Sequence, residues 1–502
     1  MVLRVAEREQ SAAEHVTSFL SGTAFSASGV AVSGVFTMLT GIIFARWLRP
    51  EGFGIYSNVL AVVTFSAGFG ALGMDFTVAR YICYYLGNGD RPLIRAVIRY
   101  GVRWGLAVSA VVGCVVFIVL RLGLLTGTKL AALAPFSVVL LFAIPILALQ
   151  SVILQAILGL QAVRIRVVLE KVLHPAMRLL LPFGLLLCFR GKITAAVGGV
   201  LFSALVLTAI ALVILRSRLQ GLPPAATASR EVTREWSSYA LPYAFFSIQN
   251  FISAGMGIDV VLVGALVSLG DSGIYAACFR FAFALSLARV GMDYAFGPKV
   301  GRLYGRGDFE SIGRLYKTSS AIGLAWTLPL SVVLVLFSRP LMACFFGPGY
   351  SRGATALAIL VVGFAADGAA GCNTTLLSMI GKPWLVLANG VVGGVVAVGL
   401  CVLLIPHYGM VGAAVGVTLA RCTATGMGTF EIWRLHGLHP FSRSLEKLLL
   451  ATLLTTVLGC IWKQQFPIAI AHSLLMLMVA IGLVFSGYVL TLRLSRFSIQ
   501  GI

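Results

Sequence analysis

Residues 54–75 read GIYSNVLAVVTFSAGFGALGMD, and residues 273–293 read GIYAACFRFAFALSLARVGMD. Both stretches begin with Gly-Ile-Tyr and end with Gly-Met-Asp, at offsets of 219 and 218 residues. Farther along, Gly89-Asp90 recurs as Gly307-Asp308, again at an offset of 218. A repeat this long predicts two related lobes, which is how many transporters with a site between two lobes are built.

The repeat lies on an almost continuously apolar background. The 502 residues are 59% hydrophobic and 11% charged, whereas a soluble protein carries about a quarter charged residues. Runs of about twenty apolar residues can cross the hydrocarbon layer of a bilayer. We expect an all-α polytopic membrane protein with fourteen transmembrane helices: 19–45, 54–79, 102–121, 133–158, 169–189, 193–215, 240–267, 273–297, 317–338, 354–379, 384–405, 411–433, 445–462 and 466–491.

The positive charge is unevenly distributed. The formal net charge is +21, and with fourteen spans most of the 38 Lys and Arg residues fall on the side of the N-terminus. This asymmetry predicts that both termini are cytoplasmic and argues against nucleic acid as a partner. The same basic loops are expected to attract anionic membrane lipids.

The longest polar stretch divides the chain. We expect a cytoplasmic N-terminal tail (1–18) without a cleaved signal peptide, an N-lobe (19–216), a cytoplasmic linker (217–236), a C-lobe (237–435) and two additional helices (436–502). Each lobe has six spans and starts on the same side, so the lobes should be related by a pseudo-twofold axis along the membrane normal.

The sequence lacks the motifs of catalysis. Gly191-Lys192 and Gly381-Lys382 have neither the upstream Gly nor the following Ser or Thr of a phosphate-binding loop. The nine cysteines form no CxxC, and the histidines have no acidic or thiol companions at ligand spacing. We therefore expect no enzyme, no metal and no cofactor, with coupling to H+ or Na+ left open.

Charged residues inside the spans are costly and are candidates for function. Two arginines, Arg46 and Arg80, lie at span ends, and the charged residues predicted inside spans are Asp75, Asp259, Arg280, Arg289, Asp293, Asp367 and Arg421.

Three ion pairs are predicted from spacing and depth. Asp259 and Arg280 each lie about ten residues from the turn of one helical hairpin, so they should meet near the midplane. Arg289 and Asp293 are i,i+4 neighbours. Asp367 and Arg421 have similar depths. Such pairs can have a purely structural role, in which they neutralise each other and fix helix packing. Alternatively they have a functional role, either in the wall of a cavity that binds an anionic substrate or as charge pairs that substrate or ions open.

Five stretches carry a resemblance to a known family: FARWLRPEGFGIYSNVLAVVTFSAGFGALGMDFTVARYI (44–82), YALPYAFFSIQNFISAGMGIDVVLVGALVSLGDSGIYAACFRFA (239–282), FFGPGY (345–350), IGKPWLVLANG (380–390) and IPHYGMVGAAVGVTLA (405–420). They resemble the polysaccharide-lipid flippases. This O-antigen (Wzx-like) branch belongs to the superfamily that also holds multidrug/toxin extruders (MATE) and lipid II flippases. The resemblance covers nearly the whole chain and implies a MATE-like fold with two six-helix lobes around a central cavity.

The resemblance also implies a function. It implies movement of an undecaprenyl-diphosphate-linked oligosaccharide, a repeat unit of O-antigen, lipopolysaccharide or exopolysaccharide, to the outer leaflet of the bacterial cytoplasmic membrane. A polysaccharide polymerase and other assembly proteins are the implied partners. The diphosphate would meet arginines on the matching helices, namely Arg46, Arg80, Arg280 and Arg289.

Three alternatives remain at this point. A lipid II flippase or a multidrug/cation antiporter would share the fold, and a non-transporting scaffold for glycan synthesis belongs to another class. An antiporter would need several midplane carboxylates in one lobe. Here Asp75, Asp259, Asp293 and Asp367 are spread out and mostly matched by arginines.

Overall fold

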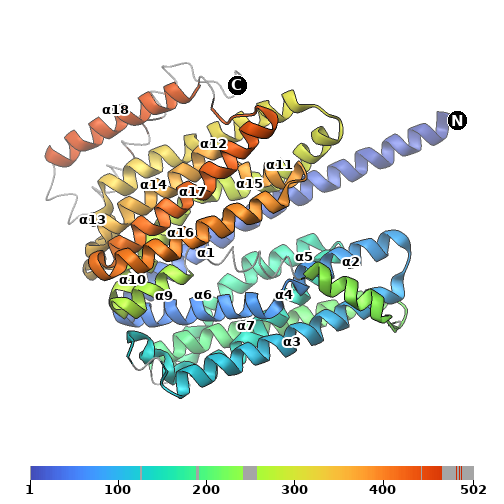
Figure 1. The fold of residues 1–502 in the computed structure, drawn as a ribbon, viewed down its shortest axis with the longest axis horizontal. Helices are drawn as coiled ribbons and strands as arrows, with labels where there is room; N and C mark the ends of the chain where they lie inside the picture. The colour runs from blue at the N-terminus through green and yellow to red at the C-terminus, as the bar shows by residue number, and fades with distance from the viewer. Residues whose placement is uncertain are drawn as a thin grey trace.

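The computed structural model describes residues 2–124, 127–187, 191–225, 227–240, 257–441 and 444–465, together with positions 482, 486 and 488. Within these residues every regular element is helical (Figure 1). Nine of the described helices are long and apolar enough to cross a membrane. The all-α multi-pass class is therefore confirmed. The count of fourteen stays a prediction, because the span 466–491 and much of 240–267 lie outside the described residues.

The first half of the chain supplies one set of helices. They are α1 (Val2–Ala71), α2 (Met74–Asn88), α3 (Arg91–Arg121), the 3-10 helix η1 (Lys129–Phe136), α4 (Ser137–Gly159), α5 (Val163–Val167), the π-helix η2 (Val168–Leu173), α6 (His174–Leu185) and α7 (Lys192–Leu219).

Helix α1 contains the predicted span 19–45 and most of the predicted span 54–79. Its backbone leaves helical geometry at Arg49, with φ 61° and ψ 172°, and the chain reverses direction there (Figure 1). Pro50 follows at once, and a residue before proline is disfavoured in the helical region. A second break at Leu72 and Gly73, both with positive φ, separates α1 from α2 inside the predicted span 54–79.

The second half supplies the other set. Its elements are α9 (Ile258–Leu266), α10 (Leu269–Phe283), η3 (Ala284–Ser286), α11 (Leu287–Gly305), α12 (Phe309–Leu336), α13 (Ser338–Phe346), η4 (Pro348–Gly353), α14 (Ala354–Ala370), α15 (Asn373–Met379), α16 (Pro383–Tyr408), α17 (Met410–His436) and α18 (Ser444–Gln465). The stretch 339–353, which lies between two of the predicted spans, is thus largely helical.

The two sets form two lobes that approach each other at one end. In Figure 1 the blue-to-green helices α2–α7 lie below the yellow-to-red helices α10–α17, and the sets converge at the left, near α9, α10 and α13. A buried apolar core joins the lobes there, because Phe44 and Tyr56 of α1 belong to the same cluster as Tyr275 of α10 and Phe346 of α13.

The polar stretch between the lobes is anchored. Residues 230–240 are helical. Trp236 has 0% exposure, and its indole N–H donates to the Tyr85 hydroxyl at 3.0 Å. The Tyr81 hydroxyl donates to Glu235 at 2.8 Å. The predicted linker is therefore packed against the N-lobe along its second half rather than being a free tether.

Candidate functional site

The repeat marks Gly54 and Gly273 lie in direct contact. A Cβ on Gly54 would stand 1.7 Å from the Leu269 carbonyl oxygen, and a Cβ on Gly273 would stand 2.2 Å from that of Pro50. Pro50 and Leu269 are themselves equivalent at the offset of 219, so the contact is reciprocal, as a pseudo-twofold requires. Only glycine permits such an approach. We call these four residues the repeat junction.

Further hydrogen bonds cross between the lobes near the repeat junction. The Asn58 amide donates to the Ser272 hydroxyl at 2.8 Å. The buried Tyr350 hydroxyl donates to the Ala45 carbonyl oxygen at 2.9 Å. These contacts hold the two lobes together at this end of the molecule.

Arg46 also bridges the lobes at this end. Its guanidinium donates to the carbonyl oxygens of Cys344 and Phe345, the latter at 2.7 Å. These carbonyls belong to the last turn of α13, where a cation is favourable because the helix dipole is negative there. The structure thus places this predicted diphosphate ligand at an exposed position near the repeat junction.

Two arginines from different lobes lie near enough for their charges to interact. Arg280 of α10 is 6% exposed, and its guanidinium lies over the Phe53 ring at 4.7 Å. Arg178 of α6 is close enough for its charge to act on Arg280, and both act on the buried Tyr56. Among the described residues neither arginine has an ion pair with a carboxylate. The sequence analysis missed Arg178, although its place inside the predicted span 169–189 was the available signal.

The predicted pair of Asp259 and Arg280 is wrong. Asp259 instead accepts hydrogen bonds from the Tyr275 hydroxyl and the Gly257 N–H, both at 3.0 Å. Arg280 donates to the Ala276 carbonyl oxygen at 3.0 Å. The turn lies at Val267 and Ser268, so Tyr275 is closer in depth to Asp259 than Arg280, which lies about 7 Å farther along α10.

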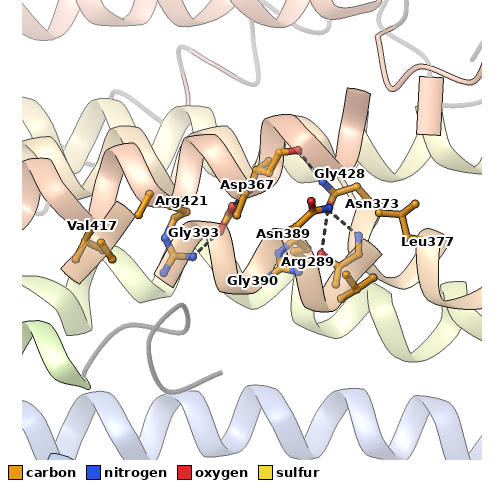
Figure 2. Close-up of a pocket in the computed structure, with 16 residues that line it drawn as sticks. Arg289, Asp367, Asn373, Leu377, Asn389, Gly390, Gly393, Val417, Arg421 and Gly428 are labelled. Carbon is orange, nitrogen blue, oxygen red and sulfur yellow. Dashed lines mark hydrogen bonds and ion pairs between the residues drawn. The ribbon is translucent and has the colours of Figure 1, made fainter. Parts of the chain in front are cut away.

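A polar pocket of about 260 Å³ lies within the C-lobe (Figure 2). Its walls come from α11, α14, α15, α16 and α17, and we call it the C-lobe pocket. Asp367 of α14 and Arg421 of α17 form an ion pair of 2.5 Å in its wall, and both side chains are nearly buried. The contact expected from their depths is therefore present. Thr425 adds a hydrogen bond of 2.6 Å to the same carboxylate.

The pair of Arg289 and Asp293 is also present. Their charged atoms are 3.4 Å apart on α11. The other Asp293 oxygen accepts a hydrogen bond of 2.6 Å from Thr375 of α15. Arg289 lines the C-lobe pocket, and its Nε is buried without a hydrogen-bond partner among the described residues. The structure thus separates Arg289 from Arg46 and places it with Asp367 and Arg421.

Two buried asparagines in the C-lobe pocket were missed by the sequence analysis. Asn373 of α15 and Asn389 of α16 are each 6% exposed and line the pocket. Asn389 donates to Glu431 of α17 at 2.7 Å, and Asn373 donates to the Thr425 carbonyl oxygen at 3.1 Å. Neutral amides carry no charge signal, so only their place within apolar runs could have revealed them.

The remaining predicted site residues lie in the N-lobe. The Arg80 guanidinium lies over the ring of Tyr239 at 4.1 Å, so it contacts the chain just after the linker. Asp75 lies in the first turn of α2, where its carboxylate accepts from the Phe76 N–H at 3.0 Å. Neither residue lines the C-lobe pocket.

A metal site is not found within the described residues. No cluster of three or more His, Cys, Asp or Glu residues there could hold a metal ion. A second pocket of about 610 Å³ lies against α14 and α17, but its lining is mostly apolar, with Phe430, Trp433 and Phe441.

A sequence match over more than half of the chain identifies its family. The family model described as polysaccharide biosynthesis protein matches residues 19–290. The chain belongs to the polysaccharide biosynthesis protein family. A second family model, MatE, matches residues 247–403. No curated protein sequence matches the chain.

Solved structures confirm the fold expected for this family. A lipid II flippase, MurJ, in an inward closed conformation matches with a TM-score of 0.68 and 12% identity, over 93% of this chain and 97% of that one. An inward-facing MATE family multidrug resistance transporter of the MOP superfamily matches at 0.62 and 17%, over 81% and 95%. A MOP superfamily transporter from Pyrococcus furiosus matches at 0.55 and 16%, over 82% and 94%. The MATE-like fold is therefore confirmed.

Proposed function

We propose that this family member is a flippase for an undecaprenyl-diphosphate-linked oligosaccharide, which it moves from the inner to the outer leaflet of the bacterial cytoplasmic membrane. A diphosphate with a polar glycan cannot cross about 30 Å of hydrocarbon unaided. The family match and the fold support transport of a lipid-linked precursor. The identity of the glycan, whether O-antigen, lipopolysaccharide or exopolysaccharide, is left open by this proposal.

The observation that carries the proposal is the pair of arginines between the lobes. Arg178 and Arg280 come from opposite lobes and repel each other. Holding the buried Arg280 beside a second, partly exposed cation is costly unless an anion compensates them. A diphosphate suits this site because guanidinium groups donate paired hydrogen bonds to phosphate oxygens and stay charged inside a membrane.

The contacts near the repeat junction support an inward-facing state. With both termini in the cytoplasm, the end with Gly54 and Gly273 faces outward, and the close backbone contact there closes the path to that side. The lipid-linked substrate would then enter between the lobes from the inner leaflet. Transport would require the repeat junction to separate, so that the two lobes rock about another point of contact.

We further propose that the mobile units are the N-lobe (19–216) and the C-lobe (237–435), with 436–502 as an addition outside the repeat. The packing of Trp236 against Tyr85 supports assigning the linker (217–236) mechanically to the N-lobe. Coupling to H+ or Na+, if the cycle uses a gradient, would fall to carboxylates such as Asp259 or Asp367.

Cation antiport is less well supported as the function. The Asp367 carboxylate pairs with Arg421, and Asp293 pairs with Arg289. A transported cation would therefore have to displace an arginine from each of these carboxylates. An anionic substrate would instead meet Arg178 and Arg280, which have no ion pair with a carboxylate among the residues that the structure describes.

The test uses the purified chain in liposomes with labelled undecaprenyl-diphosphate oligosaccharide. Arg178→Glu and Arg280→Glu should each reduce the rate of translocation by about tenfold or more, since a charge-assisted hydrogen bond contributes about 1.5–3 kcal/mol. Arg216→Glu, an exposed arginine on α7, is the matched control and should keep a rate near that of the wild type. Wild-type rates in both Arg178→Glu and Arg280→Glu, at equal insertion, would disprove the proposed mechanism.

A further inference from the structure

We propose that the first half of α3 carries a binding site for an anionic phospholipid of the inner leaflet. In this site Arg99 and Arg103 bind the lipid phosphate, and Trp104 contacts the glycerol region. Helix α3 runs along the lower edge of the N-lobe in Figure 1. The site is separate from the arginines between the lobes and uses none of the residues that would meet the diphosphate.

The level of the site in the membrane follows from the spacing of charges along α3. Residues 104–120 contain no charged side chain, and Arg103 and Arg121 flank them. At about 1.5 Å per residue, these two arginines are about 27 Å apart along the helix, close to the ~30 Å thickness of the hydrocarbon layer. With the predicted topology, Arg103 therefore lies at the headgroups of the inner leaflet. Arg99 lies about one turn farther toward the cytoplasm.

The two arginines are accessible to a ligand from the membrane. Arg95, Arg99 and Arg103 recur every fourth residue, but Arg95 contacts the protein, where it donates to the carbonyl oxygens of Leu219 and Leu222. Arg99 and Arg103 are exposed, and neither has an ion pair with a carboxylate among the residues that the structure describes. Like charges at positions i and i+4 repel each other, and an anion between them would offset that repulsion.

An aromatic pair lies beside the arginines. Trp104 is 40% exposed, and its ring stacks on that of Tyr100 with the ring centroids 6.2 Å apart. A hydrogen bond of 2.8 Å joins the Tyr100 hydroxyl to that of Ser237 and fixes the Tyr100 ring. Trp and Tyr side chains favour the headgroup level of a membrane, because each combines an apolar body with a polar group. Trp104 is thus placed to contact the glycerol region of a lipid whose phosphate is bound to Arg103.

The surface of α3 beyond Trp104 suits an acyl chain. Val111, Val115 and Ile118 are 64%, 53% and 49% exposed. Their spacing of four and three residues, and the spacing of seven from Trp104 to Val111, place all four on one side of the helix. This apolar stripe begins next to the arginine pair and continues into the hydrocarbon layer. The headgroup and a chain of one lipid therefore find their partners on the same helix.

The charge of the site selects the headgroup. Two guanidinium groups donate paired hydrogen bonds to phosphate oxygens and stay charged at this level. An anionic phospholipid such as phosphatidylglycerol brings a net negative charge. A zwitterionic phospholipid brings its own ammonium group, which two arginines would repel. A free phosphate lacks the chain that Trp104 and the apolar stripe would contact.

The test measures lipid binding at Trp104 itself. The purified full chain is placed in liposomes of phosphatidylcholine with either brominated phosphatidylglycerol or brominated phosphatidylcholine. The difference in fluorescence quenching between the wild type and Trp104→Phe reports the lipid next to Trp104. We expect phosphatidylglycerol to bind there about tenfold more strongly than phosphatidylcholine, as two cations near an anionic lipid would cause. Arg99→Gln combined with Arg103→Gln should reduce this preference to about one, measured against the same double change with Trp104→Phe.

The C-terminal end of α7 offers a matched control. Arg216→Gln combined with Arg218→Gln removes two exposed arginines at the same end of the N-lobe. Residues two apart on a helix project from different faces, so these two do not share one phosphate. This control should keep the preference of about tenfold. If the double variant of α3 does not fold, Arg99→Gln and Arg103→Gln decide singly, each with an expected preference of about threefold.

Three outcomes would overturn the lipid site. The wild type can show no preference for phosphatidylglycerol at Trp104, or the preference can survive the loss of both Arg99 and Arg103. The α7 control can also lose the preference to the same extent, which would mean a general attraction of the basic surface for anionic lipids and not a site. None of these outcomes bears on the proposed function, which is judged by the translocation rates of Arg178→Glu and Arg280→Glu.

Discussion

Asp75 and Asp293 are equivalent residues of the repeat, at an offset of 218, but their surroundings differ. Asp293 is held between Arg289 at 3.4 Å and Thr375 at 2.6 Å. Asp75 accepts from the Phe76 N–H of its own helix at 3.0 Å. The same sequence mark is thus part of a side-chain network in the C-lobe and lies at a helix N-terminus in the N-lobe.

The comparison of the two repeats distinguishes residues that have the same role in both lobes from residues whose role differs. Gly54 and Gly273 have the same task in both lobes, because each lets the backbones approach at the repeat junction. The ion pair of Asp367 and Arg421 and the amides of the C-lobe pocket lie only in the second repeat. The repeat therefore preserves the close backbone contact at the repeat junction, while this ion pair and these amides belong to the C-lobe.

The largest effect is expected at the repeat junction. Gly54→Ala and Gly273→Ala would place a Cβ within 1.7 Å and 2.2 Å of a backbone carbonyl oxygen. A backbone atom cannot move aside as a flexible side chain can, so each change should destabilise the observed state by about 3 kcal/mol or more. The measurement is the melting temperature in detergent, together with cysteine labelling of the junction from each side of the membrane.

The chain offers matched controls for both changes. Gly68 and Gly291 lie in helices of the same two repeats, and a Cβ on either would meet nothing within 4 Å. Alanine there should leave the melting temperature unchanged or raise it slightly. Equal behaviour of Gly54→Ala and Gly68→Ala would show that the lobes do not close through this contact.

The backbone features of this comparison were largely predictable from the sequence. Apolar run lengths located the helices, and the Gly-Ile-Tyr and Gly-Met-Asp marks indicated two related lobes. Contacts fixed by local spacing, such as that of Arg289 with Asp293, were also predicted correctly. The partner of Asp259 was predicted wrongly. Several side chains of α10 lie at a similar depth, and the register of the two helices across the turn determines which of them bonds to Asp259. Here Tyr275 occupies that position.

The next largest effect on stability is expected when a buried ion pair is compared with a partly exposed one. Asp367 and Arg421 have side chains that are 10% and 11% exposed, whereas Glu170 and Arg166 of the N-lobe are 28% and 24% exposed. Asp367→Ala should lower the free energy of unfolding by about 3–5 kcal/mol, because it leaves a buried arginine without its partner. Glu170→Ala should lower it by at most about 1 kcal/mol.

A double change tests whether the lost partner is the cause. Asp367→Ala combined with Arg421→Ala removes both charges, and the protein should melt at a higher temperature than Asp367→Ala alone. If the double variant is less stable than the wild type by the sum of the losses of the two single variants, the two residues act independently. The pair then contributes through packing and not through charge.

The smallest effect on stability is expected at Asp90 and Asp308, the equivalent residues of the repeat that precede α3 and α12. The Asp308 carboxylate accepts from the Ser311 backbone N–H at 3.0 Å and caps α12. Asp90 is the equivalent residue but makes no side-chain capping hydrogen bond to α3. Both follow a glycine with positive φ, Gly89 and Gly307, so the turn is shared and the cap is not. We expect Asp308→Ala to lower the melting temperature slightly and Asp90→Ala to lower it less.

A sharper test of the cap is how the melting temperatures of the wild type and of Asp308→Ala depend on pH. The hydrogen bond from the Ser311 N–H lowers the pKa of Asp308 from its ordinary value. A carboxylate whose pKa is lower in the folded state adds stability above its unfolded pKa of about 3.9 and loses it as the pH falls through the folded value. The gap in melting temperature between the wild type and Asp308→Ala should therefore be full at pH 7 and shrink below about pH 4. A gap for Asp308→Ala that stays constant down to pH 3 would mean that the charged cap adds nothing, and that the two repeats begin these helices in the same way.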